Sequence, residues 1–456
     1  MSDRILLAAF AFHPGGAHVT GWRHPSSRPA EHLTIGHHRH IAQSAERGFF
    51  DTLFLADGLY FWDRYPSGVD HYGALRPEPF TLLAALSQVT SRIGLAATVS
   101  TTYNEPYHVA RSIASLDHIS RGRAAWNLVT SRYDEEARNF GGDAHIDHSR
   151  RYERGREFVD VVNGLLDSWE DDAIRADAAS GIFADRDGLH RLDHDGEFFR
   201  VRGPLNIARP PQGHPLLFQA GGSESGLELA ADTADAVFTR GGSTGDVRAF
   251  VDDLRARAVR HGRSADAVKI MPSVMPVVGE TAADARAEAD AILALTPDAL
   301  ILEDVSHQIG VDLSGRDVDV PFDYAQFDDS GKFDTSNETR SPKPVVERLL
   351  ADGPATPRDV YSWTYRRQLL TGTGPEIADR LEELADDGGA DGFVVQFPYL
   401  PGGIDRFVDH VVPELQRRGR TATTYDDLTL RERFGHARVP DRAHRSSPAV
   451  PPVLHP

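Results

Sequence analysis

The sequence of 456 residues contains no cysteine and no apolar run long enough to cross a bilayer. The first absence excludes disulfides, thiolate nucleophiles and cysteine-ligated metal centres. The second excludes a transmembrane helix, which needs about 20 apolar residues, and the apolar stretch near the N-terminus is too short for a signal peptide. We therefore expect a cytoplasmic protein without a membrane partner.

Basic residues are also fewer than acidic residues in this chain. The chain has 49 Lys and Arg residues against 68 Asp and Glu residues, which gives a formal net charge of −19. An acidic protein repels phosphate backbones, so nucleic acid is not expected as a partner. His37, His38 and His40 lie close together but have no cysteine or carboxylate at ligand spacing, and we expect no metal site.

Short apolar runs alternate with helical patterns along most of the chain. Eight runs are typical of buried parallel strands, namely residues 5–12, 52–55, 93–99, 124–129, 216–220, 236–239, 270–278 and 389–398. An amphipathic helix follows each run, either directly or after an insertion. This order predicts a (β/α)8 TIM barrel, and not an open doubly wound sheet, as a single domain over residues 1–420.

Two insertions and a tail depart from this alternation. Residues 170–214 predict a hairpin around His194-Asp195-Gly196. Residues 295–372 are polar with little periodicity, and long loops of this kind are typical of lids or oligomer contacts. Residues 421–456 are rich in Arg, Pro and His, and we expect an extended C-terminal tail on the surface or on a second subunit.

The segment QAGGSESG, residues 219–226, predicts a phosphate-binding turn. Gly221 and Gly222 allow a sharp turn, Ser223 is a good helix N-cap, and the N–H groups of the first helical turn favour an anion. Taken alone, ordinary turn chemistry is the commoner explanation of such a loop. The prediction therefore depends on what lies at the neighbouring strand ends.

In a (β/α)8 barrel the chemistry lies where the strands end. The residues at these ends are His13, His18, Asp57, Ser100, Thr101, Asn127, Thr130 and Ser131, with the aromatic residues Tyr60, Phe61, Trp62 and Tyr103 nearby. No metal-ligand set or acid–base pair stands out among them. Neutral hydrogen-bonding groups, aromatic rings and an anion site are typical of a protein that holds a large phosphorylated cofactor.

Six segments in order carry a resemblance to a known family. They are GAHVTGWRHP (16–25), AERGFFDTLFLADG (45–58), TVSTTYNEPYHVAR (98–111), WNLVTS (126–131), HSRRYERGREF (148–158) and the Gly-Gly-Ser loop. Together they resemble the FMN-dependent monooxygenases of the bacterial luciferase-like superfamily, in the nitrilotriacetate, dibenzothiophene-sulfone and long-chain alkane monooxygenase branch.

The resemblance implies a TIM barrel that receives exchangeable FMNH2 from a separate NAD(P)H:flavin reductase and reacts it with O2. A flavin hydroperoxide then oxygenates a small organic substrate, with an aromatic or xenobiotic compound favoured. The absence of a GxGxxG motif in a strand-turn-helix setting agrees with a separate reductase. We also expect a homodimer or homotetramer.

The resemblance also implies roles for single residues. Those assigned near the flavin ring are Asp57, Ser100 or Thr101, and Asn127, and those assigned to the phosphate are His148, Tyr152, Ser223 and Ser225. Ser131, at the end of a predicted strand, and Gly222, in the turn, are further cofactor-binding candidates. His18 and Asn127 are the catalytic candidates, and the candidate substrate pocket consists of His13, Tyr60, Trp62 and Tyr103. The alkane enzymes carry a cysteine near the residue that matches His18, and this chain lacks it.

Alternatives stay open at this point. Asp57 could cap a helix, His148 could be a solvated surface histidine, and His18 could satisfy backbone groups of the first strand-to-helix loop. For the whole protein, the alternatives are a deazaflavin-dependent hydride-transfer enzyme on the same fold and a flavin-binding protein without turnover.

Overall fold

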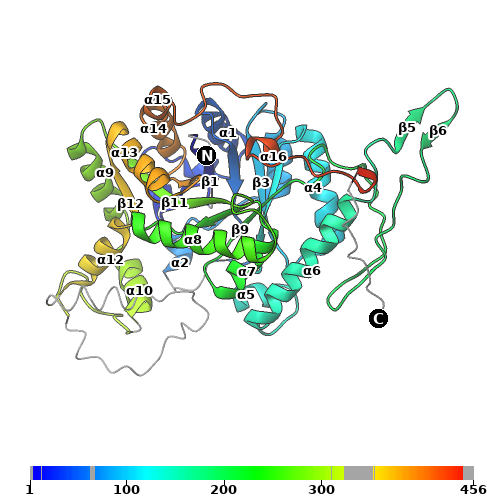
Figure 1. Cartoon of the computed structure of the whole chain (residues 1–456). Coiled ribbons are helices and arrows are strands. Elements are labelled where there is room, and N and C mark those ends of the chain that lie inside the picture. Colours follow the sequence, from blue (N-terminus) through cyan, green and yellow to red (C-terminus); the bar gives the residue numbers. More distant parts are fainter. Residues whose placement is uncertain are drawn as a thin grey trace, which may run out of the picture.

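The computed structural model of the chain describes residues 4–11, 13–61, 67–309, 311–322, 353 and 355–444. Eight parallel strands in this part of the chain form a closed ring (Figure 1). They are β1 (Leu6–Ala11), β2 (Thr52–Leu55), β3 (Gly94–Ser100), β4 (Ala124–Val129), β9 (Leu216–Ala220), β10 (Ala236–Thr239), β11 (Lys269–Val278) and β13 (Gly392–Gln396). The pairing of β1 with β13 and of β10 with β11 closes the ring, and the predicted TIM barrel is confirmed.

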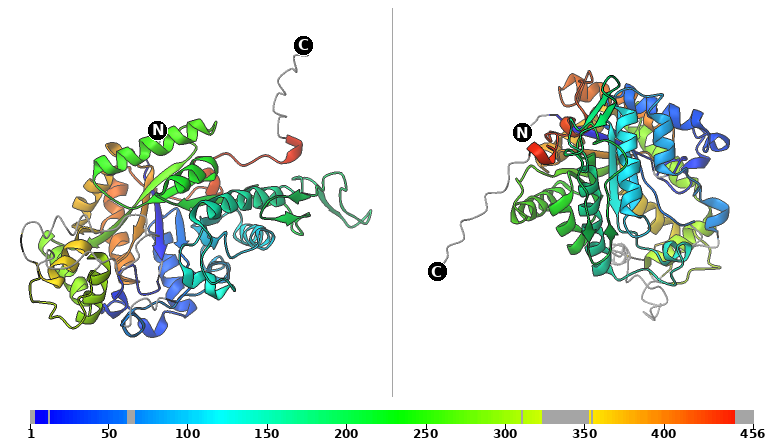
Figure 2. Two further views of the ribbon diagram at one scale, coloured as in Figure 1. Left: turned by 90° about the horizontal axis from the view of Figure 1, so that it is seen from below. Right: turned by 90° about the vertical axis from the view of Figure 1, so that its right-hand side faces the viewer.

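Helices surround the outside of this ring (Figure 2). They include α1 (Ile35–Arg47), α3 (Pro79–Leu86), α4 (Pro106–Ser120), α6 (His148–Leu166), α7 (Glu224–Thr233), α8 (Thr244–Arg260), α13 (Gly374–Asp386), α14 (Gly402–His410) and α15 (Val412–Arg417). Helices α3, α4 and α13 each carry a proline in the first turn, where its missing N–H costs nothing. The apolar faces of the surrounding helices are buried against the strands, as Leu83 of α3, Ile113 of α4 and Val161 of α6 show with exposures of 0%. None of the described helices is long and apolar enough to cross a membrane.

The interior of the barrel is filled by side chains. Alternate strand residues point inward, and small residues such as Ala96 and Ala125 leave room for the phenylalanine rings beside them. The ring centroid of Phe54 lies 5.3 Å from those of both Phe218 and Phe238. A packed interior leaves the strand ends as the place for a binding site.

Residues 421–444, the described part of the predicted tail, differ from the extended segment that we expected. Their short helix α16 (Leu430–Arg433) brings Leu430 and Phe434 into the amino-terminal end of the barrel, where they are 0% and 1% exposed. The Arg431 guanidinium pairs with the Asp235 carboxylate at 2.8 Å. Two apolar side chains within a polar stretch gave too weak a pattern to predict this closure, although it buries both of them completely.

The first insertion contains two hairpins. The predicted hairpin around His194 is present as β7 (His194–Asp195) and β8 (Arg200–Val201). A second hairpin, β5 (Ile174–Asp177) with β6 (Ile182–Ala184), was not predicted and projects away from the barrel (Figures 1 and 2).

The second insertion has more regular structure than we expected. Helices α10 (Asp298–Ile309) and α12 (Pro357–Arg366) pack together, followed by β12 (Leu369–Gly372), which pairs with the end of β11. With α9 (Ala282–Ala294), these helices enclose a separate apolar cluster that includes Ile301, Val305 and Tyr361. The expectation of an irregular polar loop was therefore wrong for these helical segments. Residues 323–352 of the proposed lid lie outside the described residues.

Candidate active site

A hydrogen-bonded cluster joins the loops after β2, β3 and β4. The hydroxyl oxygens of Ser100 and Ser131 lie 2.8 Å apart, and Ser131 donates to the carboxylate of Glu136, also at 2.8 Å. Glu136, in helix α5 (Asp134–Asn139), is 3% exposed and accepts a further bond from the backbone N–H of Leu59 at 3.3 Å. A buried carboxylate thus fixes three loops together. Sequence reasoning missed Glu136, because this residue lies in a short run of acidic residues that resembles an exposed helix.

Asn127 lies inside the barrel on β4. Its side-chain amide donates to the Thr98 hydroxyl at 3.1 Å, while its Oδ1 atom is buried without a hydrogen-bond partner among the described residues. The neighbouring strand β9 repeats the pattern, since Gln219 donates to the carbonyl of Gly226 at 3.0 Å and its Oε1 has no described partner. Buried amide oxygens without donors are costly unless a ligand or water completes them. Thr101 is fully buried next to β4. Its hydroxyl donates to the Val129 carbonyl oxygen at 3.4 Å.

The predicted phosphate residues come together at the start of α7. The Ser223 hydroxyl accepts from the Gly226 N–H as an N-cap and donates to the Tyr152 hydroxyl, both at 3.2 Å. His148 begins α6, and its exposed ring lies 4.9 Å from the Tyr152 ring. No atom lies within 4 Å of the position that a Cβ at Gly222 would take, so the loop faces open space. Tyr152 and Ser225 both line a groove of about 520 Å³ between α6 and α7.

Arg151 is the most informative residue that the sequence analysis missed. It is only 6% exposed, yet no described residue forms a hydrogen bond or an ion pair with its guanidinium. Burial lowers its pKa, with the Tyr152 ring and Glu136 acting in the opposite direction. A buried cation without a counter-ion is destabilising unless an anion binds beside it. In the sequence, Arg151 is one of four arginines in nine residues, and nothing distinguishes it from its exposed neighbour Arg150.

Of the candidate substrate residues, His13 and Tyr60 each pack against a tyrosine. His13 is buried against Tyr72, with which it shares a hydrogen bond, and burial together with Arg76 lowers the pKa of His13 to about 3. Tyr60 packs against Tyr133 with ring centroids 4.7 Å apart. Trp62 lies outside the described residues.

Asp57 follows β2, and its Oδ1 accepts from the N–H of Gly58 at 2.8 Å, so the carboxylate also stabilises its own turn. Burial raises the pKa of Asp57. Tyr103 stacks on Phe140 at 4.8 Å and bonds to Nδ1 of His145 at 2.8 Å, on the same side of the barrel as Glu136.

His18 belongs to a closed ring of hydrogen bonds. Its Nε2 lies 3.2 Å from the Tyr361 hydroxyl, which lies 2.8 Å from that of Thr296. The Thr296 hydroxyl lies 3.3 Å from that of Thr20, which returns to Nδ1 of His18 at 3.2 Å. The backbone N–H of Thr20 also points to Nδ1 at 3.4 Å, so Nδ1 is the acceptor and Nε2 carries the proton. Burial lowers the pKa of His18 to about 4, and the ring is therefore neutral.

This ring connects the first strand-to-helix loop to the second insertion. Both nitrogens of His18 are engaged by protein groups, which favours the structural alternative for this residue. A catalytic role for His18 stays a prediction. The fold and these clusters define a (β/α)8 barrel with a polar, partly unsatisfied site at the carboxyl ends of its strands.

Comparisons with known proteins agree with this class. The family model described as luciferase-like monooxygenase matches residues 16–391. The chain is 42% identical over 449 residues to nitrilotriacetate monooxygenase component A of Aminobacter aminovorans, covering 96% of this chain and 98% of that protein. It is 40% identical over 424 residues to N-acetyl-S-(2-succino)cysteine monooxygenase of Bacillus subtilis, covering 92% and 94%.

A solved structure extends the similarity to three dimensions. The crystal structure of a riboflavin lyase, with modified FMN and the substrate riboflavin, superposes with a TM-score of 0.80 at 32% identity, covering 95% of this chain and 96% of that one. The chain therefore belongs to the luciferase-like monooxygenase family, and it is an oxidoreductase of the monooxygenase type.

Proposed function

We propose that the protein binds reduced FMN and uses it with O2 to oxygenate a small organic substrate. The observation that carries the proposal is the meeting of the Ser223 and Tyr152 hydroxyls at the N-terminus of α7. Arg151 lies beside them, with its guanidinium 5.8 Å from the Tyr152 ring and its Nε buried without a hydrogen-bond partner. The related riboflavin lyase, whose solved structure includes a modified FMN, supports flavin as the ligand.

The residues fit the phosphate of FMN in charge and in hydrogen bonding. A phosphate dianion accepts bonds from hydroxyls, from the N–H groups of the first turn of α7, and from a guanidinium. Ser223 and Tyr152 supply the hydroxyls and Arg151 supplies the cation. The open space at Gly222 allows the phosphate to approach the backbone.

The residues also fit a flavin ring at the strand ends. The unpartnered amide oxygen of Asn127 can accept an N–H of the ring, and the Ser100 and Ser131 hydroxyls can bond its polar edge. When bound, reduced FMN supplies the electrons that activate O2. The chain binds and orients the flavin and excludes water from it, and the low pKa values of His13 and His18 keep both side chains uncharged at neutral pH.

A separate reductase fits the same proposal. The relative from Aminobacter aminovorans is named as component A of its monooxygenase, a name that implies a further component. We propose that an NAD(P)H:flavin reductase supplies FMNH2 to this chain.

Two substrate classes deserve a direct comparison. Aromatic side chains at the mouth, such as Tyr60, Tyr103 and Tyr133, favour an aromatic or other weakly polar compound. The names of both sequence relatives instead point to carboxylate-bearing amine or thioether compounds. We therefore propose a small organic substrate of one of these two classes.

The proposal is tested by anaerobic titration of the protein with FMNH2, oxidised FMN, reduced riboflavin and a reduced deazaflavin. We expect the tightest binding for FMNH2, followed by O2-dependent product formation with a member of one substrate class. Hydride transfer to a substrate without O2 consumption would instead establish the deazaflavin alternative. Binding without turnover of any substrate in a panel of aromatic sulfur and nitrogen compounds and aminopolycarboxylates would favour a flavin-binding protein.

A further inference from the structure

A carboxylate stands directly beside the proposed phosphate seat. Glu224 is the first residue of α7, immediately after the N-cap Ser223, and it lines the same groove as Tyr152 and Ser225. An acidic residue in the first turn stabilises the helix by itself. A carboxylate that turned toward a bound phosphate dianion would, however, repel it.

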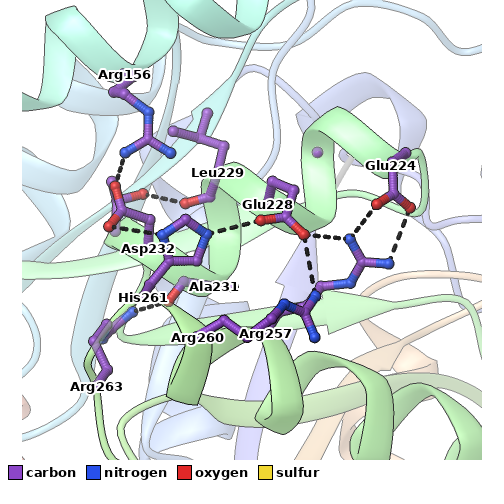
Figure 3. A network of polar contacts seen from close by, with 12 residues as sticks. Arg156, Glu224, Glu228, Leu229, Ala231, Asp232, Arg257, Arg260, His261 and Arg263 are labelled. Carbon is purple, nitrogen blue, oxygen red and sulfur yellow. Dashed lines mark hydrogen bonds and ion pairs between the residues drawn. The ribbon is translucent and has the colours of Figure 1, made fainter.

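The guanidinium of Arg257, on the neighbouring helix α8, pairs with the Glu224 carboxylate (Figure 3). Its Nη1 atom lies 2.6 Å from Oε1 of Glu224 and its Nη2 atom lies 2.9 Å from Oε2, which is a bidentate pair. The hydrogen bond from Arg257 lowers the pKa of Glu224, so this carboxylate is ionised at neutral pH.

The Arg257 side chain is itself fixed on several sides. It is 10% exposed, its Nε lies 3.0 Å from both carboxylate oxygens of Asp253, and its Nη1 lies 2.5 Å from Oε1 of Glu228. Glu228 also accepts from His261 at 2.8 Å. With its donors held at fixed positions, Arg257 has little freedom to follow Glu224 toward the groove.

The same network reaches helix α6. Asp232, one turn beyond Glu228 on α7, lies 3.5 Å from Nδ1 of His261 and pairs with Arg156 of α6 (Figure 3). Arg156 lies four residues after Tyr152 and therefore on the same face of α6. The ion pairs of α7 and α8 therefore also anchor α6, the helix on which Tyr152 lies.

We propose that Arg257 is a positioning residue that holds the Glu224 carboxylate against α8, away from the phosphate seat, and so sets the affinity for phosphorylated flavin. This inference rests on the proposed function, because the seat has this consequence only if a phosphate binds there. Arg257 does not contact the phosphate. It acts through Glu224.

The test compares FMN with riboflavin, which lacks the phosphate. We expect Arg257→Gln to weaken FMN binding by about 2- to 5-fold, the size of one charge interaction at an exposed site, because the Glu224 side chain is 77% exposed. Riboflavin binding should stay unchanged. The loss should shrink at high salt, because salt screens the freed Glu224 charge. The double variant Glu224→Gln/Arg257→Gln should bind FMN as the wild type does.

Arg260→Gln is the matched control. Arg260 lies on the same helix, carries the same charge and pairs with Glu228 at 3.4 Å, but it forms no described hydrogen bond or ion pair with Glu224 and acts on it only as a more distant charge. We expect its FMN affinity to equal that of the wild type. If Arg257→Gln does not fold, Arg257→Lys keeps the charge while losing the bidentate pair, and its FMN affinity should fall between the two values.

The outcomes separate this inference from the proposed function. A wild-type protein that binds FMN no better than riboflavin has no phosphate seat, and both proposals fail. A wild type that prefers FMN, together with an Arg257→Gln variant that keeps the full preference, overturns only the role of Arg257. An equal loss in Arg257→Gln and in the double variant also overturns it, because the effect would then come from the arginine charge itself.

Discussion

The two ends of the barrel differ in the side chains that occupy them. At the amino-terminal end, Leu430 and Phe434 fill the interior, and the charged groups around them are paired, as Arg431 is with Asp235. At the carboxyl-terminal end, Nε of Arg151 and the amide oxygen of Asn127 are buried without a hydrogen-bond partner in the described structure. Buried atoms without a hydrogen-bond partner also occur beside the closed end, Nε of Arg433 among them, but there the interior is filled by apolar side chains.

The carboxyl ends of the strands are where such a barrel holds its ligand. A buried polar atom without a partner lowers stability by about 1–3 kcal/mol, and at this end ligand binding can offset that cost. The comparison predicts that changes at the amino-terminal end alter stability and leave flavin affinity intact. Changes at the carboxyl-terminal end should do the reverse.

The largest effect is expected at the closed end. Phe434→Ala removes a ring that is 1% exposed and packs edge-on against Phe218 at 5.6 Å. We expect a loss of about 3–5 kcal/mol in the free energy of unfolding, measured by urea denaturation. The FMN affinity of the folded fraction should not change. A large loss of affinity without a loss of stability would contradict the division between the two ends.

A second effect concerns pH. The folded-state pKa of His18 is about 4, below the ordinary value of 6.5, so the unfolded chain takes up the proton first as the pH falls. The contribution of His18 to stability is complete above pH 6.5 and is lost between about pH 6.5 and 4. The difference amounts to about 3 kcal/mol.

His18→Gln should therefore flatten the dependence of unfolding free energy on pH in that window, relative to the wild type. Tyr361→Phe is the companion variant, because it removes the Nε2 partner while the histidine stays in place. Identical pH slopes for His18→Gln and the wild type would show that His18 is not a buried neutral group.

The third prediction compares the FMN affinities of variants at two neighbouring arginines, Arg150 and Arg151. Arg151→Met should weaken FMN binding by about 2 kcal/mol, which is the usual strength of a hydrogen bond to a charged group. Stability should stay the same or rise, because an unpaired buried charge is removed. Arg150→Met is the control, since Arg150 is exposed and pairs with Glu153 and Glu197. Equal affinities in the two variants would remove Arg151 from the phosphate seat.

The smallest effect is expected from the hydroxyls. Ser223→Ala and Tyr152→Phe each remove one neutral hydrogen-bonding group, and we expect about 1 kcal/mol of FMN binding energy from each, measured by calorimetry. Riboflavin binding should not respond. Because the two hydroxyls lie 3.2 Å apart, their effects should not be additive in the double variant.

Much of the architecture could be predicted from the sequence because it depends on local patterns. The eight barrel strands are continuous apolar runs, whereas the shared role of Tyr152 and Ser223 was implied by the family resemblance. The missed features depend on contacts between distant residues. Phe434 packs against Phe218 more than 200 positions away, and the isolation of Arg151 is visible only when its surroundings are known.

The position of Phe434 has a consequence for the order of events during synthesis. A growing chain has delivered all eight barrel strands to the ribosome exit by the time Gln396 has emerged, but Leu430 and Phe434 are still to come. Until they arrive, Phe218 lacks the ring of Phe434 that packs edge-on against it in the finished structure. The amino-terminal end of the barrel can therefore close only after residue 434 has been synthesised.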